Sequence, residues 1–266
     1  MNEPRKKFKI VTDKSARVIL PNTLTLIGVC IGLTSINFAL NQNFKLAIVA
    51  IVSAAIIDGL DGRIARLIKG TSKVGKELDS LTDIISFGVA PAFIMYFWTL
   101  NSLGKIGWLI SLIYVVCVAL RLARFNINTG REASWKDNFF EGVPSPAGGI
   151  LVLSPLVYEQ SDLSIFNFDL KIITPILFII VSFLLISKIP TYSFKKIIVP
   201  RSITIFLLLG IVLLFGLLLI FPFNVIVLGS AIYLLGIPLS ILHYFKLKKD
   251  LLINNLSTED EPEDML

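Results

Sequence analysis

Long apolar runs set the strongest limit on how this chain can fold. A helix of about 20 apolar residues spans a hydrocarbon core about 30 Å thick. A content of 55% hydrophobic and 17% charged residues agrees with burial in lipid. The sequence predicts an all-α, polytopic membrane helix bundle of about eight transmembrane helices. The apolar runs lie near residues 22–41, 43–62, 82–100, 106–123, 146–158, 170–189, 202–221 and 223–245.

The basic residues are distributed unevenly between alternate connections. Of the 25 lysines and arginines, only Lys45, Lys105 and Lys171 fall in one set of connections, and the others fall in the alternate set or at the two ends. Because cytoplasmic loops are enriched in Lys and Arg, this asymmetry predicts cytoplasmic N- and C-termini. The net charge of +6 then indicates contact with anionic lipid and not with nucleic acid.

Composition divides the chain into four segments. Residues 1–19 mix basic and apolar side chains, which is typical of an amphipathic helix lying on an anionic membrane surface. Residues 20–200 form a membrane core, and 201–248 add two transmembrane helices. Residues 249–266 end in an acidic run and are expected to be a disordered, solvated tail. His243, the single histidine, lies near the end of the last apolar run, so catalysis by histidine is not expected.

Four aspartates interrupt this apolar sequence. Asp58 and Asp61 are three residues apart, and Asp79 and Asp83 are four apart, so each pair shares one face of a helix. Residues 67–74 read as a cytoplasmic turn that brings the two helices together. A carboxylate in the membrane costs about 2.5–3.5 kcal/mol at the centre, and clustered carboxylates repel one another. Such a group needs counter-charge.

Divalent cations can supply this counter-charge. Oxygen ligands without His or Cys favour Mg²⁺, Mn²⁺ or Ca²⁺ over zinc, and two such ions can hold a pyrophosphate. Gly62 and Gly75 permit close approach of a ligand or of a facing helix, and Arg66 can reach a phosphate oxygen. Two alternatives stay open at this point: Asp and Arg pairs that anchor helices at the membrane edge, and a divalent-cation transporter. Clustering of the acids at one depth speaks against transport.

The spacing Asp58-x-x-Asp61-Gly62-x-x-Ala65-Arg66, followed after eight residues by Gly75-x-x-x-Asp79-x-x-x-Asp83, resembles the signature of the CDP-alcohol phosphotransferase family at every fixed position. The resemblance implies transfer of a phosphatidyl group from a CDP-linked lipid to an alcohol, with release of CMP. It also implies that the four aspartates bind two divalent cations, Mg²⁺ or Mn²⁺, with Asp83 as the general base. Contacts with the CDP-lipid are implied for Asn22, Thr25, Asp61, Gly62, Ala65, Arg66, Ser72, Gly75 and Asp79.

Two further stretches bear on the acceptor alcohol. Arg121 and Arg124 are three residues apart on one helix face, just before Asn126, and arginine can clamp a carboxylate or a phosphate. Both arginines can equally be topology anchors. Residues 141–148 contain a Pro-Ser-Pro turn, which can also be ordinary loop punctuation.

These two stretches, together with residues 20–25 and 86–91, resemble the phosphatidylserine synthase branch of the family. The resemblance implies CDP-diacylglycerol as donor and L-serine as acceptor, with Arg121, Arg124 and Asn126 holding the serine carboxylate. It further implies a homodimer in a prokaryotic cytoplasmic membrane, with the site facing the cytoplasm. Glycerol 3-phosphate and inositol are the alternative acceptors.

Overall fold

The computed structural model describes residues 13–68, 72–128, 139–164, 169–192 and 201–259, and these residues are helical apart from short connections and one pair of strands. Each predicted apolar run lies on a helix, so the expectation of a helical bundle is confirmed. Most of the predicted amphipathic segment 1–19 lies outside the described residues. The helices at the apolar runs are α1 (Asp13–Leu40), α2 (Phe44–Leu67), α4 (Ala90–Trp98), α5 (Lys105–Asn128), α6 (Ser145–Glu159), α7 (Leu170–Ile186), α8 (Arg201–Ile220) and α9 (Pro222–Glu259).

Four helical stretches in the described part of the chain are long and apolar enough to cross a membrane: Ile19–Leu40, Lys73–Trp98, Lys105–Ile127 and Pro222–Leu247. The apolar stretches of α7 and α8 are shorter, and α2 carries charged residues near its C-terminal end. The chain is therefore a membrane protein. The count of eight crossings and the cytoplasmic position of both ends stay predictions.

A short helix, α3 (Lys73–Asp83), continues into α4 through a wider turn of π-helix, Ile84–Val89. Pro91 has no N–H group, so the usual α-helical bond to the carbonyl oxygen of Phe87 cannot form. The hydroxyl of Tyr114 on α5 donates to that oxygen at 2.7 Å. The wider turn begins directly after Asp83, and it therefore affects how this side chain is aimed.

One pair of short strands, β1 (Phe139–Glu141) and β2 (Pro190–Tyr192), runs antiparallel in the described residues. No strands were predicted from the sequence, because three residues are too few to show a two-residue period. Gly142 follows β1 with a φ of 76°, a conformation that favours glycine. The hydroxyl of Thr191 donates to the carbonyl oxygen of Gly142 at 2.7 Å. This pair ties the start of α6 to the chain that follows α7.

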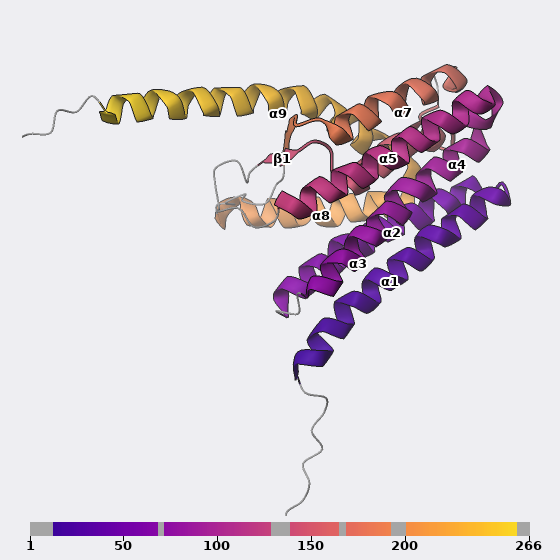
Figure 1. Cartoon of the computed structure of the whole chain (residues 1–266), viewed down its shortest axis with the longest axis horizontal. Helices are drawn as coiled ribbons and strands as arrows, with labels where there is room; N and C mark the ends of the chain where they lie inside the picture. The colour runs from indigo at the N-terminus through magenta and orange to yellow at the C-terminus, as the bar shows by residue number, and fades with distance from the viewer. Residues whose placement is uncertain (1–12, 69–71, 129–138, 165–168, 193–200, 260–266) are drawn as a thin grey trace, which may run out of the picture.

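The buried core lies mainly between α4, α5, α6 and α7. Helix α1 lies along α2 at one side of the bundle (Figure 1). Phe87, Ile94, Tyr114 and Phe178 are completely buried in this core. Helix α9 packs against α6 and β2, and α8 packs against α9. The C-terminal part of α9 extends away from the other helices (Figure 1).

The predicted tail 249–266 begins as helix, because α9 continues through Glu259. Leucines follow the last basic residues of this segment, and leucine favours helix. Residues 260–266 lie outside the described residues.

Candidate active site

Two helices carry the four aspartates predicted to form the site. Asp58 and Asp61 lie near the C-terminal end of α2, and Asp79 and Asp83 lie on α3. Ser72 caps α3, since its Oγ accepts a hydrogen bond from the N–H group of Gly75 at 2.9 Å. The cap fixes where α3 begins and thereby which of its faces is turned toward α2.

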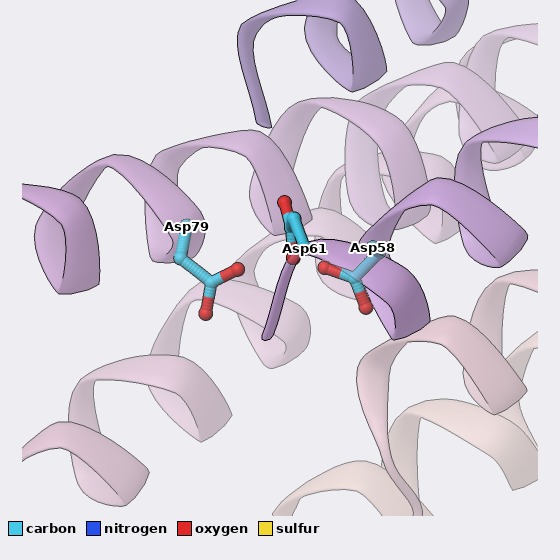
Figure 2. Close-up of side chains that lie close together, drawn as sticks. All are labelled: Asp58, Asp61 and Asp79. Atoms are coloured by element: carbon cyan, nitrogen blue, oxygen red, sulfur yellow. The ribbon is translucent and has the colours of Figure 1, made fainter. Parts of the chain in front are cut away.

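Three of these carboxyl groups form a compact acidic group. Asp58, Asp61 and Asp79 each offer an oxygen atom, and these atoms all lie within 4.8 Å of one another. Figure 2 shows the three carboxyl groups around a common space, with Asp61 between the other two in this view. Like charges at such separations repel by about 3 kcal/mol per pair at an effective dielectric constant of about 20. Oxygen atoms that share one Mg²⁺ or Mn²⁺ ion lie within such a distance, so the donor set fits a divalent cation.

Asp83 lies one turn further along α3, outside this acidic group. Its carboxyl group contacts that of Asp58. Its Oδ1 atom is buried and has no hydrogen-bond partner among the described residues. The guanidinium group of Arg121 lies close enough to interact electrostatically with it. Asp83 thus adjoins the acidic group and a buried cation, and it keeps one oxygen free of protein partners.

Helix α1 supplies a wall of the site. The Thr25 hydroxyl is buried and donates to Oδ2 of Asp61 at 2.6 Å. On the same helix, Oδ1 of Asn22 lies 2.7 Å from the position that a Cβ atom on Gly75 would occupy. The absence of a side chain at residue 75 therefore leaves room for the Asn22 side chain of α1.

Gly62 has a different environment from Gly75. A Cβ atom built on Gly62 would have no neighbouring atom within 4 Å. Ala65 is partly exposed, and Arg66 is exposed, with its Nε donating to the carbonyl oxygen of Gly62 at 2.9 Å. The face of α2 next to Asp61 is consequently open and has a cation beside it.

Arg121 lies on α5 and is only 8% exposed. One of its terminal N–H groups donates to Oγ of the fully buried Ser145 at 2.6 Å. Its Nε atom is buried and lacks a hydrogen-bond partner in the described part of the chain. The Pro-Ser-Pro turn at the start of α6 therefore binds a buried cation that interacts electrostatically with Asp83. It is not an ordinary loop without further contacts.

The other two residues predicted for the acceptor make different contacts. The guanidinium group of Arg124 donates to the carbonyl oxygens of Ile186 at 2.6 Å and Ser187 at 3.3 Å, at the C-terminal end of α7. Carbonyl groups at a helix end lack partners within the helix, and a cation satisfies them well. Asn126 donates from its side-chain amide to Oγ of Ser80 at 2.9 Å. Of the three predicted residues, Arg121 is the one that the structure brings beside Asp83.

Two tyrosines near Arg121 were not identified from the sequence. Tyr114 on α5 and Tyr233 on α9 both lie close enough to interact electrostatically with its guanidinium group. A hydroxyl group inside an apolar run was the available signal, because a buried tyrosine usually needs a hydrogen-bond partner.

A family model described as CDP-alcohol phosphatidyltransferase matches residues 18–242, a range that includes every site residue above. The chain belongs to this family. A protein of Mycobacterium leprae named CDP-diacylglycerol–serine O-phosphatidyltransferase is 48% identical over 143 residues, which are 53% of this chain and 47% of that protein. A protein of the same name from Helicobacter pylori is 44% identical over 135 residues, 51% of this chain and 56% of the relative.

A third family member with this name, from Bacillus subtilis, is 34% identical over 178 residues, which are 66% of this chain and 92% of that protein. The chain spans about half the length of the mycobacterial and Helicobacter relatives that it matches. Membership of the CDP-alcohol phosphatidyltransferase family thus agrees with the family suggested by the spacing of the aspartates.

Proposed function

We propose that this protein transfers the phosphatidyl group of CDP-diacylglycerol to the hydroxyl group of L-serine and releases CMP. The observation that carries the proposal is the position of Asp83, next to the acidic group and next to the buried Arg121. Family membership supports a CDP-linked lipid as donor. The names of the similar proteins support serine as acceptor.

The donor binds over the open face of α2. Asp58, Asp61 and Asp79 would hold divalent cations, with Asp83 as a further ligand, and when bound these ions neutralise the pyrophosphate and the departing phosphate. Thr25 keeps the Asp61 carboxylate oriented through its 2.6 Å hydrogen bond.

Other residues would contact the rest of the CDP moiety. Gly62 lets the phosphates approach the α2 backbone, and the exposed Arg66 next to it contributes a positive charge to an anionic ligand. Asn22, Ala65, Ser72 and Gly75 belong to the same proposed donor site, where Ser72 and Gly75 also fix the start of α3 against α1.

Asp83 acts as the general base. A serine hydroxyl is a weak nucleophile at neutral pH, and a carboxylate within hydrogen-bond reach accepts its proton as the attack proceeds. The hydroxyl oxygen forms a bond to the phosphorus atom of the phosphatidyl group, and the bond between that phosphorus and the oxygen of CMP breaks. The proton remains on Asp83 until solvent removes it, so no covalent enzyme intermediate is required.

Arg121 binds the serine carboxylate. Its buried position strengthens the electrostatic attraction, and the guanidinium geometry matches a carboxylate. Arg124 and Asn126 remain predictions for this role, because their side chains already bind α7 and Ser80 and would need to exchange these bonds.

The two substrates reach the site from different sides. The acyl chains of the donor enter from the inner leaflet of a prokaryotic cytoplasmic membrane, and serine arrives from the cytosol. We also propose a homodimer, on the basis of the family resemblance.

The test uses the purified full chain in detergent with CDP-diacylglycerol and Mg²⁺ or Mn²⁺. We expect CMP release to require serine and to be much slower with glycerol 3-phosphate or inositol. If the protein prefers glycerol 3-phosphate or inositol, that alcohol is the acceptor and serine is not. If no alcohol supports CMP release while proteoliposomes take up divalent cations, the protein is a transporter and the proposal is wrong.

A further inference from the structure

Three buried polar atoms around Arg121 have no hydrogen-bond partner among the described residues. They are Oδ1 of Asp83, Nε of Arg121 and the hydroxyl oxygen of Tyr233. Arg121 interacts electrostatically with both other side chains, so the three lie in one neighbourhood. A buried polar atom without a partner destabilises the fold, because it has lost its hydrogen bond to water. Three such atoms on α3, α5 and α9 indicate a place for a small polar ligand.

Tyr233 is directed inward because it lies on the packed face of α9. Ser230, Tyr233, Ile237 and Ser240 are spaced by three or four residues, which places them on one side of the helix. Ser230 and Ile237 are buried. The buried Ser240 donates from its hydroxyl to the carbonyl oxygen of Pro190 in β2 at 2.8 Å. These contacts hold the Tyr233 side of α9 against the bundle.

The other end of the same stretch of α9 is also held. Asn224 accepts a hydrogen bond from the N–H group of Asp162 at 3.0 Å and donates one to its carboxylate at 3.2 Å. Tyr233 therefore lies between two attachment points and not on a free helix. Helix α8, by contrast, has mostly exposed apolar side chains in its described part.

Thr191 does not satisfy the Tyr233 hydroxyl as a donor. The two side chains are neighbours. The Thr191 hydroxyl hydrogen, however, is used in the 2.7 Å bond to the carbonyl oxygen of Gly142. A tyrosine hydroxyl can donate one hydrogen bond and accept another, so Tyr233 retains capacity for a ligand.

We infer that Tyr233 is an acceptor-binding residue, whose hydroxyl group forms a hydrogen bond with the amino acid that Arg121 holds by its carboxylate. This inference rests on the proposed function. The ammonium group of an amino acid can donate to the Tyr233 hydroxyl oxygen, and its carboxylate can bind the Arg121 guanidinium group, with which Tyr233 interacts electrostatically. The last helix then contributes directly to acceptor selection, a role that its apolar sequence does not reveal.

The experiment compares the full-length wild type with Tyr233→Phe, which removes one oxygen atom and keeps the ring. Tyr96→Phe is the matched control, because Tyr96 lies on α4 with its ring 5.2 Å from that of Trp108 and plays no part in the proposed site. Initial rates of CMP release give the KM for serine and the KM for CDP-diacylglycerol, and thermal unfolding gives the Tm. We expect Tyr233→Phe to raise the KM for serine about tenfold, and to leave the KM for CDP-diacylglycerol and the Tm unchanged. Tyr96→Phe should match the wild type.

Each other outcome decides the matter. An unchanged KM for serine means that the hydroxyl binds only solvent, and it overturns the inference. A parallel change in both KM values with a lower Tm means a structural role and also overturns it. If the wild type prefers another alcohol, the serine assignment fails. The KM for that alcohol is then compared between Tyr233→Phe and Tyr96→Phe, and an unchanged value in Tyr233→Phe overturns the inference. CMP release that depends on no acceptor refutes both the proposed function and this inference.

Discussion

At the scale of single residues, the carboxyl group of Asp83 is set apart from the other three by its surroundings. It contacts Asp58 and interacts electrostatically with Arg121, and one of its oxygens is buried without a partner among the described residues. We expect Asp83→Asn to lower kcat by about 100- to 10,000-fold, because general-base catalysis contributes about that much. The measurement is CMP release, with binding of CDP-diacylglycerol determined separately and expected to persist.

Glu77→Gln is the control for Asp83→Asn. Glu77 is exposed on the same helix, so loss of its charge should leave turnover unchanged. Substantial turnover by Asp83→Asn would remove Asp83 as the base.

Two glycines of the signature should respond differently to alanine. In Gly75→Ala the new Cβ atom would lie 2.7 Å from Oδ1 of Asn22 and 3.0 Å from Oγ of Ser72, so these side chains, including the one that caps α3, must shift. We expect this variant to lose about 1–3 kcal/mol of stability, which thermal unfolding measures. In Gly62→Ala the new atom meets no protein atom, so the Tm should not fall, and the affinity for CDP-diacylglycerol should fall instead. Equal losses of Tm in both variants would contradict this distinction.

The sequence identified the aspartates and arginines of the site, but not the contacts that each side chain makes. The spacing of the aspartates was sufficient to bring Asp58, Asp61 and Asp79 together, because helical periodicity fixes which side chains share a face. Periodicity also placed Arg121 and Arg124 on one face. It could not show that one guanidinium group lies beside Asp83 and the other on the end of α7, because neighbouring helices determine those contacts.

At the scale of elements, the π-helical turn after Asp83 depends on one tyrosine. In Tyr114→Phe the buried carbonyl group of Phe87 loses a 2.7 Å hydrogen bond, which should cost about 1–3 kcal/mol. Because the turn begins next to Asp83, we expect kcat to fall more than the affinity for CDP-diacylglycerol. Thermal unfolding and initial rates measure the two effects.

A second substitution tests whether Pro91 causes this dependence. Tyr114→Phe combined with Pro91→Ala regains an N–H group that can reach the Phe87 carbonyl, so the double variant should be more stable than Tyr114→Phe alone. Additive destabilisation would show that the tyrosine hydroxyl has no special relation to the turn.

Arg124 and Arg121 provide a second comparison between elements. Arg124→Ala removes the hydrogen bonds that cap α7 and should cost about 1–3 kcal/mol of stability. Arg121→Ala should raise the KM for serine at least tenfold, since it removes the proposed carboxylate ligand. Thermal unfolding and serine titrations separate the two effects. A larger rise in KM for Arg124→Ala would restore that residue as the main acceptor ligand.

Short elements were the ones that sequence reasoning missed. The strands β1 and β2 have three residues each, and the π-helical turn adds only a slight change of period inside a long apolar run. Neither leaves a pattern long enough to detect. Both form because a tertiary partner completes their hydrogen bonds, namely the facing strand in one case and Tyr114 in the other.

At the scale of the whole molecule, the acidic group should link stability to divalent cations. Three carboxylates within 4.8 Å repel one another in the folded chain, and a bound cation relieves this repulsion. Saturation at 100 times the dissociation constant should add about 2.7 kcal/mol of stability. We expect EDTA to lower the Tm and to stop CMP release, with Mg²⁺ or Mn²⁺ restoring both.

Asp61→Asn serves as the reference in the cation experiment. It removes one of the three charges of the group, so its Tm should depend much less on Mg²⁺ or Mn²⁺ than that of the wild type. A wild-type Tm that does not change with Mg²⁺ or Mn²⁺ would argue against cation binding by these three aspartates.

The residues of the donor site are translated before those of the acceptor site. The donor residues lie within 22–83, whereas the acceptor side extends from Asp83 to Arg121, Ser145 and, by our inference, Tyr233. The roughly 150 residues between Asp83 and Tyr233 take about 8–30 s to translate at about 5–20 residues per second. A nascent chain can therefore assemble the donor half in the membrane well before the ribosome has delivered the helix that completes the acceptor half.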